Sequence, residues 1–581
     1  MFLESDFINS HILSLLTWLP LAAAALLYLV PAFDADRDPH GSKSRTFAVI
    51  CGLAVFYLSL TLLKRFEVAN GGIQFEEVAP WISAIGVQYR LGLDGISLWL
   101  VLLTTFLMPI VYLASGSVHS NKRGYLASMF VLQTAMTGSL VALDLFLFYV
   151  FWEMMLAPMY FIIGLWGGKN RVYATMKFVI YTVVGSVLML IAVLYVAWRA
   201  TEQGIAQPFD ITLLTQSLNL TLLDELLVFG AFALAFGIKV PIFPFHTWLP
   251  DAHVEAPTGG SVVLAGVLLK MGLYGFIRFA YPLAPRAAEL FAPTLAILAV
   301  VGVIYGALVA WAQTDMKKLV AYSSVSHLGY CVLGMVAFNS VSTSGSIYQM
   351  LNHGVTTGAL FLLVGVLYDQ KHTRLIADYG GLASKVPVFA AIFLVFTFSS
   401  IALPLTNGFV GEFLILIGSF KVFPILTAVC GIGVVLGAVY MLTLYLKTAF
   451  GKFDPEKNGD LKDVSVRELC TFAPLLVLVF VMGIYPQPFL DRIEPTLDRY
   501  FSEVNGRSER LASLTLSDEP TTRGHEGQKP DQGEYEPDMP GLFTLKSSYP
   551  LNSSAVEPSG VVGKPGAASL EIAKFKEHTE L

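Results

Sequence analysis

Four charged residues lie inside long apolar segments of this 581-residue chain: Glu153, Lys239, Lys270 and Glu412. A charged side chain at the centre of a bilayer costs about 2.5–3.5 kcal/mol on insertion scales, so such residues face a protein interior or a water-filled path. Two acids and two lysines placed in this way predict that a charge, most simply a proton, moves through the protein.

Glu153 and Lys239 have the side-chain types needed for an ion pair that can open and close. Burial favours a neutral lysine, whereas a nearby carboxylate favours the charged form, so a change in their separation would change the proton affinity of the lysine. The alternative for these two residues is a static structural ion pair.

Lys270 and Glu412 are interpreted as further relay residues. Lys270 lies near the middle of its predicted segment, which favours a relay role over a lysine that reaches the membrane surface from a helix end. Glu412 follows an interruption of its helix and is interpreted as a terminal acid that loads or releases protons. The alternative for Glu412 is a cap of the interrupted helix.

Four histidines accompany these charges: His246, His253, His327 and His353. A histidine near its unperturbed pKa can accept and release protons, although a lone buried histidine is also an ordinary core residue. His246, His327 and His353 are predicted as members of the proton path, whereas His253 is predicted to lie at the membrane interface. Neither the histidines nor the four cysteines have metal-ligand spacing.

The elements that position these residues belong to a chain with the composition of a membrane protein. Hydrophobic residues make up 55% and charged residues 14% of the chain, whereas soluble chains carry roughly 25% charged residues. At about 20 residues per span, the apolar runs predict an all-α polytopic membrane protein with about 14 transmembrane helices. The predicted spans are 11–31, 46–65, 95–115, 124–142, 144–166, 172–198, 224–250, 260–281, 293–312, 318–338, 346–368, 387–420, 426–449 and 469–486.

Two of these spans, the seventh and the twelfth, are interrupted by proline within residues 237–250 and 401–412. Proline removes a helical hydrogen bond, and unwound backbone at membrane depth persists only where it is buried in protein or lines a cavity. Lys239 and Glu412 lie within or just past these breaks. Broken helices at matching places predict two inverted five-helix repeats, formed by spans 4–8 and 9–13.

The sequence therefore predicts five parts. Residues 503–581 change in character, and the stretch 513–541 is rich in Pro, Gly, Ser, Thr and acidic residues, so it cannot bury enough apolar surface to order itself. No long amphipathic helix is expected after the last span. The parts are residues 1–120 (helices 1–3 with an extramembrane loop), 121–285 (first repeat), 286–450 (second repeat), 451–500 (last span and flank) and 501–581 (mostly disordered polar tail). Within the first part, residues 74–89 are expected to form an extramembrane hairpin or an interfacial loop.

The charge distribution indicates the orientation. Lys and Arg gather in alternate loops, which the positive-inside rule assigns to the cytoplasm. Both termini are then expected on the outer side. The net charge is −6 and no basic patch is present, which argues against nucleic-acid binding.

Three stretches and one shorter motif carry a resemblance to a known family. Residues 151–160 read FWEMMLAPMY, residues 239–253 read KVPIFPFHTWLPDAH, and residues 313–329 read QTDMKKLVAYSSVSHLG. Over roughly residues 10–490 the chain resembles the antiporter-like subunits of proton-pumping NADH:quinone oxidoreductase, respiratory complex I. The Trp-Glu-Met-Met form and the glutamate that ends 408–412 (GFVGE) are most similar to the subunit M type, the counterpart of mitochondrial subunit 4.

The resemblance implies a role for each matching position. Glu153 and Lys239 would form the ion pair of the family, Lys270 would be its central lysine, His327 its linker and Glu412 its terminal acid. Protons would cross a bacterial inner membrane along this axis, driven by quinone reduction in partner subunits. NAD, FMN, iron–sulfur clusters and quinone are expected in those partners and not in this chain. Neighbouring antiporter-like subunits L and N and the lipid bilayer are the expected contacts.

Other functions stay open at this point. The same fold and Lys/Glu axis would serve a subunit of a multi-subunit cation/proton antiporter, or of a hydrogenase-type or photosynthetic dehydrogenase membrane complex. A scaffold subunit with an inactive channel is disfavoured because the whole charged set is present. The residues alone do not exclude sodium as the transported ion.

Overall fold

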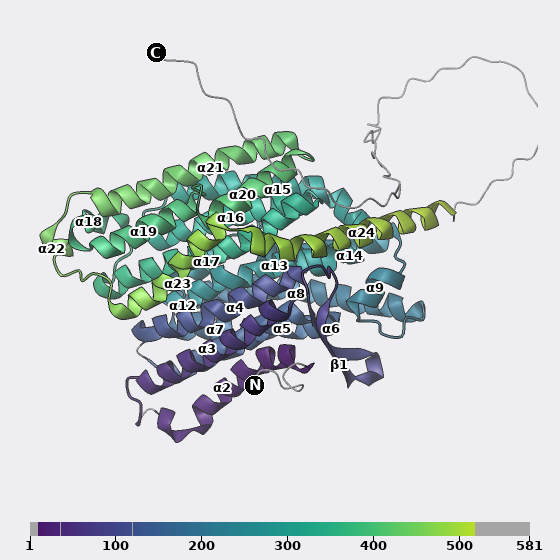
Figure 1. The fold of residues 1–581 in the computed structure, drawn as a ribbon, viewed down its shortest axis with the longest axis horizontal. Coiled ribbons are helices and arrows are strands. Elements are labelled where there is room, and N and C mark those ends of the chain that lie inside the picture. Colours follow the sequence, from purple (N-terminus) through teal and green to yellow (C-terminus); the bar gives the residue numbers. More distant parts are fainter. Residues whose placement is uncertain (1–9, 35, 119, 518–581) are drawn as a thin grey trace, which may run out of the picture. The chain divides into compact units, whose positions relative to one another are not determined.

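Helices form nearly all of the structure, a computed structural model that describes residues 10–34, 36–118 and 120–517 (Figure 1). Eleven helical segments of the described residues are long and apolar enough to cross a membrane. An apolar segment in lipid must satisfy its own backbone hydrogen bonds, which a helix does. The eleven are α2 (Ile12–Leu29), α3 (Ser42–Arg65), α4 with η4 (Gly95–Ser117), α6 with α7 (Leu145–Trp166), α8 (Arg171–Glu202), α12 to α14 (Thr258–Leu283), α15 (Pro285–Trp311), α16 (Met316–Val336), α17 (Ser340–Lys371), α21 with η8 (Pro424–Phe450) and α23 (Val466–Ile484).

These segments confirm an all-α, multi-pass membrane protein, although the predicted count of 14 is not confirmed. The three remaining predicted spans also contain helices, but these are more polar or shorter. One is α5 (Lys122–Val141), and the other two are broken. The short elements that connect the helices are η2 (Pro31–Phe33), α9 (Ile211–Ser217), η7 (Ile376–Asp378), α18 (Leu382–Lys385) and α22 (Pro455–Asn458), whereas η3 (Ser83–Ile85) lies between the two strands described below.

Both predicted helix breaks are present. In the seventh span, α10 (Leu222–Lys239) ends at Lys239, and α11 (Trp248–Glu255) begins after eight residues that include two prolines. In the twelfth span, α19 (Pro387–Ser400) and α20 (Asn407–Phe420) flank six residues, among which Ala402 and Leu405 have φ of 56° and 74°. A left-handed backbone at residues other than glycine costs energy and persists only where the surrounding structure enforces it. The five-helix repeats themselves remain a prediction.

Three segments form the protein interior. Within each segment, an apolar stretch of 18 residues was compared for burial inside the protein. The buried share of this stretch is 100% in Thr258–Leu283 and 94% in both α16 and α17, but only 33% in α3 and in Pro424–Phe450. The first segment is not a uniform α-helix, because the π-helical turns η5 (Leu264–Leu268) and η6 (Phe276–Ala280) separate α12 (Thr258–Val263), α13 (Leu269–Gly275) and α14 (Tyr281–Leu283). These buried segments carry Lys270, His327 and His353.

Residues 74–93 form the expected hairpin. Strands β1 (Gln74–Ile82) and β2 (Val87–Leu93) pair antiparallel, with Val78 opposite Arg90 and Ala79 opposite Tyr89. Arg90 forms an ion pair with Asp210, which also caps α9. The hairpin is thereby tied to the start of α9.

The C-terminal region differs from the prediction. A single helix, α24 (Gln487–Ser517), follows the last span. Helical structure therefore extends past residue 501 into the predicted tail, and a long amphipathic helix is present where none was expected. Its apolar residues recur at helical spacing and are buried, and the helix packs against α4, α14, α15 and α17. These residues are Leu490, Ile493, Leu497, Val504 and Leu511. The rest of the predicted tail, residues 518–581, lies outside the described part of the chain.

Candidate functional site

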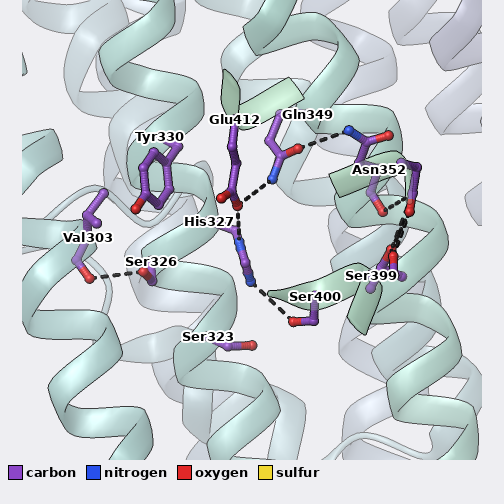
Figure 2. Close-up of polar contacts among 12 residues, drawn as sticks. Val303, Ser323, Ser326, His327, Tyr330, Gln349, Asn352, Ser399, Ser400 and Glu412 are labelled. Carbon is purple, nitrogen blue, oxygen red and sulfur yellow. Dashed lines mark hydrogen bonds and ion pairs between the residues drawn. The ribbon is translucent and has the colours of Figure 1, made fainter. Parts of the chain in front are cut away.

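Glu412 and His327, which are 85 residues apart in the sequence, meet in the protein interior. His327 of α16 places Nδ1 3.1 Å from Glu412 Oε1 of α20, and both side chains are buried. Figure 2 shows His327 between Glu412 and Ser400, with the hydroxyl of Ser400 3.4 Å from His327 Nε2. The Tyr440 hydroxyl lies at the same distance from that nitrogen. His327 therefore has an acid at one ring nitrogen and hydroxyl groups at the other.

Helix α17 adds amides to this acid. Gln349 Nε2 donates to Glu412 Oε1 at 3.0 Å, and Asn352 Nδ2 donates to Gln349 Oε1 at 3.0 Å (Figure 2). A buried carboxylate needs such donors, because an unpaired charge in the interior is strongly destabilising. The two amides thus stabilise Glu412 without adding a fixed cation.

A second polar cluster sits at the break of the twelfth span. Ser399 donates to Asn407 Oδ1 at 2.6 Å, and Thr356 of α17 lies 2.6 Å from the Ser399 hydroxyl. Asn407 Nδ2 in turn lies 3.3 Å from Thr356 Oγ1. These contacts hold the end of α19, the start of α20 and the middle of α17 together next to the Glu412 site.

Lys270 has a histidine as its partner. Its Nζ lies 2.6 Å from His353 Nδ1 and also donates to the backbone carbonyl of Ala265 in the π-helical turn η5. π-Helical turns inside α-helices often occur at functional sites. Lys270 and His353 are 1% and 3% exposed, so this contact is shielded from solvent and lipid.

The two pairs approach each other. The ring centroids of His353 and His327 are 5.9 Å apart, and a cavity of about 10 Å³ is lined by both rings together with Gln349 and Asn352. That volume is close to the space needed for one water molecule. Four groups that can exchange protons therefore form a nearly continuous line, in the spatial order Lys270, His353, His327 and Glu412.

Lys239 does not pair directly with Glu153. Its Nζ lies 4.9 Å above the centroid of the Trp152 ring, and within the described residues no Lys239 nitrogen comes within 4.0 Å of a carboxylate oxygen. A ring face attracts a cation electrostatically. Glu153 Oε1 is buried without a hydrogen-bond partner. The predicted Glu153–Lys239 pair is thus open in this structure, and the Trp152 ring lies beside the lysine.

Neither of the other two histidines forms a hydrogen bond with this line, although His253 is near enough to interact electrostatically with Lys270 and His353. His246 lies between α10 and α11, and its ring packs against Phe243 and Tyr305 at 5.6 Å and 5.2 Å. His253, expected at the membrane interface, is fully buried and stacks on Phe361 at 4.7 Å between centroids. In the described part of the chain, no group of three or more His, Cys, Asp or Glu residues could hold a metal ion.

Several residues of this site were not predicted from the sequence: Gln349, Asn352, Thr356, Ser399, Ser400 and Tyr440. A signal for the first two was present, because Gln349, Asn352 and His353 follow each other at positions i, i+3 and i+4 of a predicted membrane span. Such residues share one face of the helix. Polar groups that share a face within a membrane segment mark a functional site.

Gly411 allows α20 to approach α17 at this site, which leads to a first prediction. A Cβ at Gly411 would lie 2.5 Å from Gln349 Oε1 and 2.8 Å from Asn352 Nδ2. Gly411→Ala is expected to displace both amides and to destabilise the fold by about 1–3 kcal/mol. The measurement is the thermal midpoint and the amount of assembled protein on native gels. Gly431→Ala is the control, since its Cβ meets nothing within 4 Å; equal behaviour of both variants would contradict this packing role.

Known proteins resemble this chain over most of its length. A family model described as NADH:quinone oxidoreductase/Mrp antiporter, TM, matches residues 142–437, and one described as NADH-ubiquinone oxidoreductase chain 4, amino terminus, matches residues 76–142. NADH-quinone oxidoreductase subunit M of Rhodobacter capsulatus is 45% identical over 511 residues, which cover 87% of this chain and 99% of that protein.

Solved structures have the same fold. A chain of respiratory complex I from Thermus thermophilus with bound NADH superposes with a TM-score of 0.75 at 34% identity, covering 85% of this chain and 99% of that one. A chain of the Mrp complex from Dietzia sp. DQ12-45-1b reaches a TM-score of 0.73 at 19% identity, covering 87% and 99%. At that identity the second likeness concerns the fold alone.

Proposed function

The chain belongs to the family of antiporter-like NADH-quinone oxidoreductase subunits that includes subunit M and chain 4, and from that premise we propose that it translocates protons in the membrane arm of the complex. The observation that supports this function best is the buried line from Lys270 through His353 and His327 to Glu412. Charged and titratable groups are costly inside a membrane, and a line of them that is interrupted only between the two histidine rings can serve ion transfer.

The geometry supports a relay without a set direction, which runs from Lys270 of the predicted first repeat to Glu412 of the predicted second repeat. Lys270 Nζ can pass a proton to His353 Nδ1 across 2.6 Å. The cavity between the two rings leaves room for one bridging water between His353 and His327. His327 can then donate from Nδ1 to Glu412 Oε1 at 3.1 Å, while Ser400 and Tyr440 offer hydroxyls to its other nitrogen.

The first half of the protein supplies the element that can change state. Lys239 rests on the Trp152 ring, and Glu153 is left without a partner on Oε1. Closing the Glu153–Lys239 pair would hold the proton on Lys239, and opening the pair would allow Lys239 to release that proton. We infer that the structure represents the open arrangement and that the closed pair is the alternative state.

The energy for these changes comes from partner subunits in this proposal. NAD, FMN, iron–sulfur clusters and quinone act there, and this chain contributes no redox chemistry of its own. Antiporter-like subunits L and N are the proposed neighbours in a bacterial inner membrane. The basic loops lie on the cytoplasmic side and both termini on the outer side, as the positive-inside rule favours.

A subunit of a cation/proton antiporter is the second candidate, because one family model covers both kinds of complex. The relatives that share 40% identity or more favour the oxidoreductase. The likeness to the Mrp complex supports only a common fold.

The test of the proposed function is Glu153→Gln in membranes that contain the assembled complex. Glutamine keeps the size of the side chain but cannot form an ion pair with Lys239 or exchange a proton. We expect proton pumping driven by NADH oxidation to fall by about tenfold or more, since a positioned acid or base contributes at least that much to proton transfer.

Native gels establish assembly, and Glu509→Gln on the exposed face of α24 is the matched control. Normal pumping by an assembled Glu153→Gln complex would refute the relay role of Glu153. NADH-independent exchange of sodium for protons by the isolated membranes would favour the antiporter instead.

A further inference from the structure

A cavity of about 430 Å³ lies apart from the residues of the proposed relay. It is bounded by α24, by α9 and by the end of the segment Thr258–Leu283. Four arginines and two carboxylates line it, so positive charges exceed negative ones by two. These charged residues are Arg278, Arg499, Arg507, Arg510, Asp94 and Glu503.

The two carboxylates are already paired. Arg278 Nη2 donates to Asp94 Oδ2 at 2.6 Å. Arg499 Nε donates to Glu503 Oε1 at 2.7 Å. The excess positive charge of the cavity therefore belongs to Arg507 and to Arg510.

Arg507 is the more deeply placed of these two cations, with 4% of its surface exposed. Its Nη atoms donate to the backbone carbonyls of Leu214, Thr215 and Leu283, while its Nε has no partner. Burial, and next the charge of Arg510, lowers the pKa of Arg507 to about 10, so it remains a cation at neutral pH.

Among the described residues no carboxylate forms a salt bridge with this pair of arginines, and Glu225, whose charge acts on Arg507, is already paired with Arg286. Arg510 donates to the carbonyl of Gln216, and among the described residues neither arginine contacts an acid. The Tyr500 hydroxyl, which also lines the cavity, is buried without a partner. Buried cations and buried hydroxyls are normally compensated, so a site that presents both without a counterpart is complementary to an anion.

We propose that this cavity binds a phosphate-bearing anion, held by Arg507 and Arg510 and hydrogen-bonded by Tyr500. The planar guanidinium group matches the oxygens of a phosphate and can bind them in a bidentate manner. The phosphate can belong to a lipid headgroup or to free inorganic phosphate.

The surroundings favour the lipid. Ile73, Leu143 and Val504 add apolar surface to the same cavity, and Pro282 belongs to the end of a membrane-spanning segment. Arginines at the ends of transmembrane helices can bind the phosphate of an anionic lipid headgroup through charge-assisted hydrogen bonds. Because the cavity is separate from Lys270 and Glu412, this binding is independent of the proposed proton relay.

Two variants remove the site in different ways. Arg510→Gln removes one exposed cation of the cavity. Gly506→Leu fills the cavity without a change of charge, since Gly506 lines it and a Cβ there meets nothing within 4 Å. Arg199→Gln is the control, because it removes a cation that does not line the cavity. Native gels establish that each complex is assembled.

The experiment uses the intact complex in two arms. In the first, the complex is placed in phosphatidylcholine vesicles that contain a photoactivatable phosphatidylglycerol, and labelled peptides are mapped. In the second, delipidated complex is equilibrated with radioactive orthophosphate. We expect labelling of peptides from 487–517 in the parent complex and in Arg199→Gln, and a loss of about tenfold in affinity in both cavity variants.

Each outcome decides the proposal. Lipid labelling that both cavity variants lose supports the site and identifies a lipid phosphate as its ligand. Orthophosphate retention that both variants lose, without lipid labelling, supports the site with free phosphate as its ligand. Equal labelling and retention in the parent and in both cavity variants, or none in either arm, overturns the proposal.

Discussion

Lys270→Met is expected to reduce NADH-driven proton pumping by about a hundredfold while the complex still assembles. Methionine is similar in length and adapts to a buried site. It removes the only described cation beside His353 Nδ1. The carbonyl of Ala265 and the ring nitrogen of His353 each lose a hydrogen-bond donor, which lowers the free energy of unfolding by about 1–3 kcal/mol. The substitution also removes a buried cation, which acts in the opposite direction. The measurement is proton uptake and NADH:quinone turnover in inverted vesicles.

A second substitution at this position separates charge from proton exchange. Lys270→Arg keeps the positive charge, but arginine does not release its proton in proteins. If Lys270 acts as a relay, the arginine variant is expected to be as inactive as the methionine variant. Recovery of pumping with arginine would show that Lys270 is a fixed charge. Lys421→Met, at an exposed position between α20 and α21, controls for the loss of a lysine.

Glu412→Gln is expected to have an effect of similar size. Its amide oxygen can still accept from Gln349, and His327 can still form a hydrogen bond with the amide, so the local packing is retained. The amide cannot take up a proton, so transfer from His327 ends there. We expect pumping to fall by about a hundredfold, with normal assembly on native gels.

Glu412→Asp provides the informative comparison. It keeps a carboxylate but shortens the side chain by one methylene, which lengthens the 3.1 Å contact with His327. Partial pumping is expected, between that of the parent and that of Glu412→Gln. Full activity of Glu412→Gln would refute the proposed terminal role, and Glu456→Gln at an exposed position is the matched control.

The sequence was sufficient to predict features that local physics determines. Proline within an apolar run removes a helical hydrogen bond, and both predicted breaks occur where proline lies. The mixed stretch that includes residues 74–89 forms the expected hairpin. The charges at 270 and 412 lie in the interior, because their cost in lipid leaves little alternative.

The sequence was insufficient where partners come from distant segments. His327 and Glu412 were both identified, but their contact depends on how α16 packs against α20. The Trp152 ring was not expected to receive Lys239, since a carboxylate is the more obvious neighbour for a lysine. Helix α24 was missed because a search for continuous apolar runs passes over a polar helix whose buried residues recur every three, four or seven positions.

The end of α10 at Lys239 has an electrostatic consequence. The aligned peptide dipoles of an α-helix sum to about half a negative elementary charge at its C-terminus, where the last carbonyls lack partners within the helix. Lys239 is the final residue of α10, so its backbone lies at that end of the helix, and its ammonium group rests on the Trp152 ring. This negative pole stays in place whether or not Glu153 is near, and it can stabilise a cation by up to about 2 kcal/mol. The broken helix thus acts as a permanent counter-charge, which lowers the energy needed to separate the lysine from its acid.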